Sequence, residues 1–146
     1  MEMEARIKEE LNKIEAAEDV RIIWSAESGS RAWGFASPDS DYDVRFIYVR
    51  NRKDYLRLNP VRDVIEWQLD EVLDISGWDT RKALQLLYKS NPTLFEWCNS
   101  PIVYRETEEA QWLKDMLPQY FSMKKSLYHY LSMAKSNYHK YLQGEE

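Results

Sequence analysis

The hydrophobic pattern of this sequence changes its period near residue 79, and that change limits the folds open to the chain. Before it, the pattern predicts one amphipathic helix over residues 3–17 and then short segments rich in β-branched and aromatic residues, as in strands. Strands are predicted over residues 21–26, 43–49 and 64–69, the last running on towards Asp74. After residue 79 the apolar residues follow helical spacing. This order predicts an α+β fold, a small mixed or antiparallel sheet flanked by helices with a helical C-terminal part.

Helix-start signals divide the second half of the chain. Asp79 reads as a helix cap, and Asn91-Pro92 combines a cap with proline at the first helical position. A short strand is predicted over residues 102–104, and Thr107 begins a helix with acids in its first turn. A last helix carries an apolar stripe of Met123, Leu127, Leu131, Ala134, Tyr138 and Tyr141. We expect a core over residues 1–105 and C-terminal helices over 106–146 packed on it; the stripe packs either on the preceding helix or in a homodimer.

Composition excludes several classes of protein. A chain of 146 residues with 44% hydrophobic residues is long and apolar enough to bury the core of one domain. A net charge of -5 argues against a polycationic surface for duplex DNA. Cys98 is the single cysteine, so an internal disulfide is excluded, and no apolar run is long enough to span a bilayer. We therefore expect a cytoplasmic protein without a membrane partner.

Two aspartates at alternate positions precede the second predicted strand. On a strand, side chains at i and i+2 share one face at a spacing of roughly 6–7 Å, so Asp41 and Asp43 project together. Their charges repel unless a cation lies between them, and Mg²⁺ commonly binds through one or two carboxylates plus substrate phosphates. An acidic surface loop is the simpler alternative. A calcium loop beginning at Asp39 is excluded because Val44 and Arg50 occupy its glycine and bidentate-acid positions.

The Gly29-Ser30 turn supplies the second half of this predicted site. Glycine permits close approach of backbone N–H groups to phosphate oxygens, Ser30 adds a hydroxyl donor, and Arg31 is long enough to reach a phosphate. Arg45 shares the face of the aspartates and either neutralises them in the absence of metal or contacts substrate. A third carboxylate is expected downstream, among Asp70, Glu71, Asp74 and Asp79. Asp74 is favoured because it lies at the expected end of a strand, and Asp70 is second.

Gly29-Ser30-Arg31 followed by Asp41-Tyr42-Asp43 resembles the Gly-Ser … Asp-x-Asp signature of the DNA polymerase beta-like nucleotidyltransferase superfamily. The run GSRAWGFASPDSDYDVRFIYV, with DVIEW, WDTRKALQLL, KSNPTLFEW and SPIVY, is similar to a bacterial branch of predicted nucleotidyltransferases, over roughly residues 20–140. The resemblance implies a compact mixed sheet, catalysis with Mg²⁺ or Mn²⁺, and an NTP donor, with ATP binding among the expected properties. It places the triphosphate at Gly29 and Ser30 and the metals at Asp41, Asp43 and, less directly, Asp74. Members of this branch usually run longer, so the C-terminal end is expected to be truncated or a short variant.

Two functions from different classes follow from these residues. The first is an enzyme that moves an NMP group from an NTP to a hydroxyl of RNA, a small molecule or a protein and releases pyrophosphate. The second is a non-catalytic nucleotide-binding or regulatory, antitoxin-like module with the same fold. Metal-dependent labelling of an acceptor separates the two.

Overall fold

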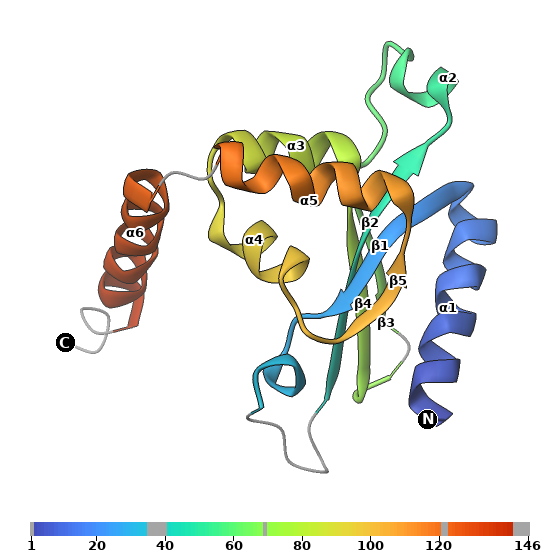
Figure 1. Ribbon diagram of the computed structural model, residues 1–146, viewed down its shortest axis with the longest axis horizontal. Coiled ribbons are helices and arrows are strands. Elements are labelled where there is room, and N and C mark those ends of the chain that lie inside the picture. The colour runs from blue at the N-terminus through green and yellow to red at the C-terminus, as the bar shows by residue number, and fades with distance from the viewer. Residues whose placement is uncertain (1, 35–40, 69, 121–122, 142–146) are drawn as a thin grey trace.

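The computed structural model describes residues 2–34, 41–68, 70–120 and 123–141 and confirms the α+β fold (Figure 1). One mixed sheet has the strand order β3-β4-β2-β1-β5. Its strands are β1 (Val20–Glu27), β2 (Tyr42–Arg50), β3 (Val64–Gln68), β4 (Leu73–Asp79) and β5 (Val103–Glu106).

The central strand β2 has one antiparallel and one parallel neighbour. It pairs antiparallel with β1 and parallel with β4, while β3 and β5 lie at the two edges in antiparallel pairs. Parallel strands begin at the same edge of a sheet, so the starts of β2 and β4 lie side by side. Asp43 is there the register partner of Asp74.

The third predicted strand is wrong in extent, because residues 64–79 form a hairpin of two strands. The Asp70 carboxylate accepts hydrogen bonds from the N–H groups of Val72 and Leu73, both at 2.9 Å, and so reverses the chain. Asp74 is therefore the second residue of a new strand, not the end of the old one. Strand β4 was not predicted because Gly77 interrupts its apolar pattern. Glycine is needed at this position, since a side chain there would run into the buried ring of Phe46.

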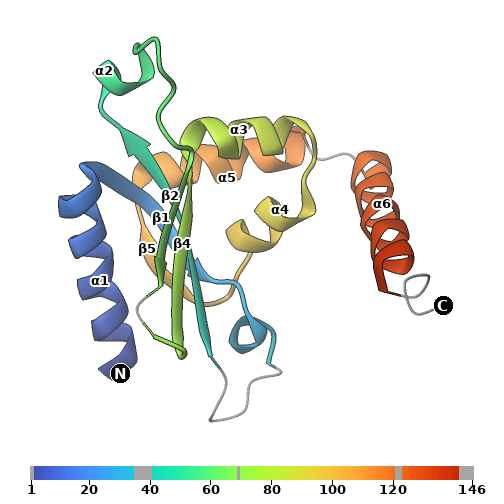
Figure 2. The ribbon, with the colours of Figure 1, turned by 180° about the vertical axis from the view of Figure 1, so that it is seen from behind.

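Each face of the sheet has its own hydrophobic core. Helix α1 (Glu2–Glu18) covers one face alone, and α3 (Thr80–Tyr88), α4 (Pro92–Cys98) and α5 (Glu108–Tyr120) cover the other (Figures 1 and 2). The α1 face buries Ile7, Leu11, Ile14, Val44, Phe46, Tyr48, Ile65, Leu73 and Ile75. The other face buries Ile23, Trp24, Ala26, Ile47, Leu87, Leu94, Trp97, Leu113 and Leu117.

The predicted helix starts at Asp79 and Asn91 are confirmed. The Asp79 carboxylate accepts from the N–H of Arg81 at 2.8 Å and caps α3. The Asn91 side chain accepts from the first N–H groups of α4, with Pro92 at the first helical position. Two short helices lie in connections between strands: η1 (Ser30–Trp33), a 3₁₀ turn after β1, and α2 (Arg52–Tyr55) after β2.

The last helix, α6 (Met123–Tyr141), stands away from the sheet (Figure 1). Its stripe side chains Leu127, Leu131 and Tyr138 are all more than half exposed. It contacts α4 through the Tyr130 hydroxyl, which donates to Glu96 at 3.0 Å. The expected homodimer through these helices stays a prediction. Within the described part of the chain, every helix is too short or too polar to cross a membrane.

Candidate metal and nucleotide site

Two carboxylates and one guanidinium meet where β2 and β4 begin. Asp43 and Asp74 are register partners, so their side chains leave the same face of the sheet. The Arg45 Nη2 lies 3.0 Å from Asp74 Oδ2 and 4.0 Å from Asp43 Oδ1. Its Nη1 donates to the carbonyl oxygens of Val44, at 2.9 Å, and Asp74, at 3.2 Å. Arg45 was expected either to neutralise Asp41 and Asp43 or to contact substrate, and its ion pairs in the structure are with Asp43 and Asp74.

The position of this cluster follows from the second core. Asp43, Arg45 and Ile47 alternate with Val44 and therefore lie on the β2 face that α3, α4 and α5 cover. Ile47 is fully buried beneath those helices, whereas the Asp43 side chain keeps 36% of its surface exposed. The helices therefore leave the first residues of β2 uncovered on this face, where a ligand can reach them.

The Gly29-Ser30 bend packs directly against Asp43. The Ser28 N–H donates to the Asp43 carbonyl at 2.8 Å, which ties the bend to the start of β2. A Cβ built on Gly29 would collide with the Asp43 carboxylate. Only glycine lets the backbone come this close. Ser30 is the first residue of η1 and follows Gly29 directly. The bend therefore brings a serine hydroxyl close to Asp43, a carboxylate of the type that binds metals.

Beneath the bend lies Glu27, a buried carboxylate that the sequence reasoning missed. Its Oε2 accepts from the N–H groups of Asp43, at 2.8 Å, and Gly29, at 3.3 Å, and its Oε1 accepts from the Tyr104 hydroxyl at 2.8 Å. Burial raises the pKa of Glu27, and the three hydrogen bonds oppose that rise. Burial and the Glu27 carboxylate together raise the pKa of Tyr104. The available signal was an acid closing an apolar strand directly before Ser28-Gly29-Ser30.

Asp41 and Arg31 are the other predicted site residues within the described part of the chain. Asp41 is exposed and directly precedes β2, two residues before Asp43. The Arg31 guanidinium stacks over the Tyr42 ring, 3.9 Å from its centroid, and Tyr42 packs against the core on the α1 face, opposite to the Asp43 side chain. Asp39 lies outside the described residues.

Of the candidates for the third carboxylate, Asp74 is the one placed beside Asp43. Asp70 sits at the β3–β4 turn and pairs with Arg6 of α1 at 2.7 Å, and that hydrogen bond, together with those from the Leu73 and Val72 N–H groups, lowers the pKa of Asp70 to about 2. Asp79 is a buried cap at the far end of β4 and accepts a hydrogen bond from the Tyr55 hydroxyl at 3.1 Å.

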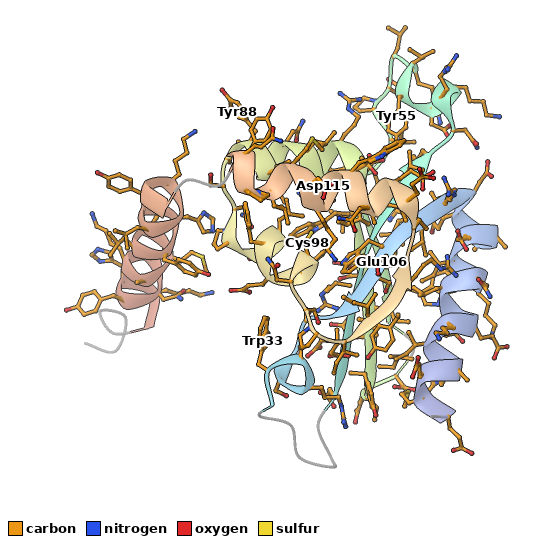
Figure 3. The ribbon with its side chains drawn as sticks, viewed as in Figure 1. Trp33, Tyr55, Tyr88, Cys98, Glu106 and Asp115 are labelled. Carbon is orange, nitrogen blue, oxygen red and sulfur yellow. The ribbon has the colours of Figure 1, made fainter. Side chains whose placement is uncertain are left out.

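An open groove of about 560 Å³ borders the bend. It is lined by Ser28, Gly29 and Ser30 of the bend, Trp33 of η1 and Glu96 of α4. Figure 3 shows Trp33 rising from η1 on the side that faces α4. The groove therefore extends the site from the bend towards the helices.

A comparison with known protein families identifies the family of this chain. The family model named RlaP, described as "RNA repair pathway DNA polymerase beta family", matches residues 3–146. The chain belongs to the RlaP family. The resemblance to DNA polymerase beta-like nucleotidyltransferases is thereby confirmed at the level of the family.

One relative of this RlaP-family chain is the uncharacterized protein YcgL of Bacillus subtilis (strain 168), 50% identical over 145 residues. The match covers 99% of this chain and 56% of that protein, so the chain spans little more than half of its relative. No solved structure matches the chain.

Polymerase beta-like nucleotidyltransferases usually use divalent metals, and the donor set here suits such an ion. Among residues 2–34, 41–68, 70–120 and 123–141, no group of three His, Cys, Asp or Glu is arranged as a metal cage. A pair of carboxylates is instead what Mg²⁺ uses when phosphates of a substrate complete its shell. Asp43 and Asp74 form such a pair, and a guanidinium now holds them together. The residues present therefore fit a metal that arrives with a nucleotide.

Proposed function

We propose that this chain transfers an NMP group from an NTP to a hydroxyl acceptor in a metal-dependent reaction that releases pyrophosphate. The observation that carries the proposal is the contact between the Gly29 backbone and the Asp43 carboxylate, with Asp74 in register beside it. A phosphate-binding type of bend and a metal-binding type of carboxylate pair are thus in contact, although Gly29 and Asp43 are 14 positions apart in the sequence.

In the proposed reaction, each of the site residues has a separate role. The Gly29-Ser30 bend binds the triphosphate through the Ser30 N–H and hydroxyl, with Arg31 at its edge, while the Gly29 N–H stays bonded to Glu27. Asp41, Asp43 and Asp74 hold the divalent metal, Mg²⁺ or Mn²⁺, which when bound stabilises the charge on the transferring phosphoryl group. The acceptor oxygen forms a bond to the α-phosphorus as the bond to the β-phosphate oxygen breaks. Asp74 accepts the proton from the acceptor hydroxyl, and pyrophosphate leaves.

The proposed acceptor is an RNA hydroxyl. The family description names an RNA repair pathway, which supports RNA over a small molecule or a protein. We also propose a cytoplasmic location, because Cys98, the one cysteine of the chain, is a buried free thiol.

Arg45 gives a specific reason to keep the second candidate, a nucleotide-binding module without turnover. Its guanidinium already occupies the space between the two carboxylates and supplies the positive charge that a metal would supply. A module of this kind binds NTP without any need for Mg²⁺.

A labelling experiment separates the two proposals. The protein is incubated with α-labelled NTPs, Mg²⁺ or Mn²⁺ and RNA oligonucleotides with free hydroxyl ends, beside parallel reactions with γ-labelled NTPs. The enzyme proposal expects label on RNA from the α-position only, lost in Asp43→Asn and Asp74→Asn and kept in Asp70→Asn. Nucleotide binding without labelling under every metal would contradict the enzyme and favour the module.

A further inference from the structure

We propose that the groove beside the Gly29-Ser30 bend holds the nucleobase of the bound NTP, stacked on Trp33, and that Glu96 makes it select guanine. This inference rests on the proposed function, because it takes the triphosphate to lie at the bend. It adds to that function the choice of nucleotide.

The shape and position of the groove suit the base half of a nucleotide. Its volume of about 560 Å³ lies within the usual range of small-molecule sites, and its lining begins at Gly29 and Ser30, where the triphosphate ends. A nucleotide anchored there by its phosphates extends its ribose and base along the groove towards Trp33 and α4.

Trp33 offers the stacking surface. Its side chain is 46% exposed, and the other residues that line the groove are Ser28, Gly29, Ser30 and Glu96. The other strongly exposed indole, Trp112 of α5, differs in lining an apolar pocket with Ile23, Val49 and Leu84. Stacking of a base on an aromatic side chain contributes about 1–3 kcal/mol, measured by substitution with alanine.

Glu96 supplies the selectivity. An ionised carboxylate only accepts hydrogen bonds, and the exposed Tyr130 hydroxyl of α6 already donates to its Oε1 at 3.0 Å. Guanine presents two adjacent donors, N1–H and the N2 amino group, to such an acceptor. Adenine presents one amino group beside the acceptor N1, which a carboxylate repels. The groove therefore favours GTP over ATP.

Binding measurements with three ligands test the proposal. GTP, ATP and inorganic tripolyphosphate are titrated with Mg²⁺ into the wild type, Trp33→Ala, Trp33→Phe and Glu96→Gln. Trp112→Ala controls for the loss of an exposed indole away from the groove. We expect GTP to bind more tightly than ATP, Trp33→Ala to weaken GTP about 5- to 150-fold, and Trp33→Phe to retain most of the affinity. Glu96→Gln should bring GTP and ATP together, and tripolyphosphate should bind all variants alike.

The failures of the two proposals look different. If tripolyphosphate binds and Trp33→Ala leaves GTP affinity unchanged, the base platform is wrong while the phosphate site stands. If neither tripolyphosphate nor any NTP binds, the proposed function fails and the groove assignment fails with it. An RNA oligonucleotide ending in guanosine that loses affinity in Trp33→Ala, with GTP unaffected, would overturn the assignment to the nucleotide.

Discussion

Replacing Gly29 with alanine tests the contact on which the site is built. The new Cβ would collide with the Asp43 carboxylate, which must rotate away from its present position beside Arg45. Because that side chain is 36% exposed, it has room to move, and the cost to stability falls at the low end of overpacking, about 1 kcal/mol. For a domain of this size the melting temperature falls by about 4 °C.

The effect on function is much larger than the effect on stability. A displacement of about 1 Å in a group that positions the reactants costs about 100-fold in rate. Thermal unfolding and NTP transfer at a temperature well below unfolding measure the two effects on the same samples.

Gly77→Ala is the matched control. A Cβ there would run into the Phe46 ring in the α1 core, on the opposite face of the sheet. Phe46 is fully buried and cannot turn aside, so this variant should lose more stability, about 2–3 kcal/mol, and keep the activity of its folded molecules. Wild-type transfer by Gly29→Ala, or equal loss of transfer in both variants, would refute the reasoning.

Three further predictions concern other charges of the molecule. Arg45→Gln leaves Asp43 and Asp74 without a cation between them, so the metal-free variant should melt at a lower temperature than the wild type. Mn²⁺ should then raise its melting temperature by more than that of the wild type, and equal rises would contradict this. Glu27→Ala removes the acceptor of three hydrogen bonds and should cost about 3 kcal/mol in urea unfolding, and a loss below 1 kcal/mol would show that other groups accept those bonds. The Arg6 partner lowers the pKa of Asp70 below its unfolded value, so this ion pair stabilises the fold above pH 4 and is lost as the pH falls towards 2. Asp70→Asn should therefore flatten the pH dependence of unfolding between pH 4 and 2, and an unchanged slope would argue against the pair.

Local patterns were sufficient to predict much of the fold. The helix over residues 3–17 and the strand over 43–49 each appear within one residue of the predicted bounds. The helix has an apolar face at helical spacing, and the strand is rich in β-branched and aromatic residues. The caps at Asp79 and Asn91 are local hydrogen bonds, and local sequence specifies them. Strand β4 was missed because its pattern makes sense only beside Phe46, a contact between residues far apart in sequence.

The candidate site shows the same division. The choice of Asp74 over Asp70 followed from a wrong strand boundary, yet the register of β2 and β4 places Asp74 beside Asp43. Glu27 could not be recognised as support for the bend, since its partners come from three separate segments of the chain. The groove could not be predicted either, because only the fold brings Trp33 and Glu96 to the same part of the surface.

The most direct test of the central claim is Mn²⁺ binding, followed by electron paramagnetic resonance, with and without a non-hydrolysable NTP. We expect Mn²⁺ to bind tightly only together with the nucleotide, Asp43→Asn and Asp74→Asn to abolish this binding, and Asp70→Asn to preserve it. Undiminished Mn²⁺–nucleotide binding by Asp43→Asn would contradict it.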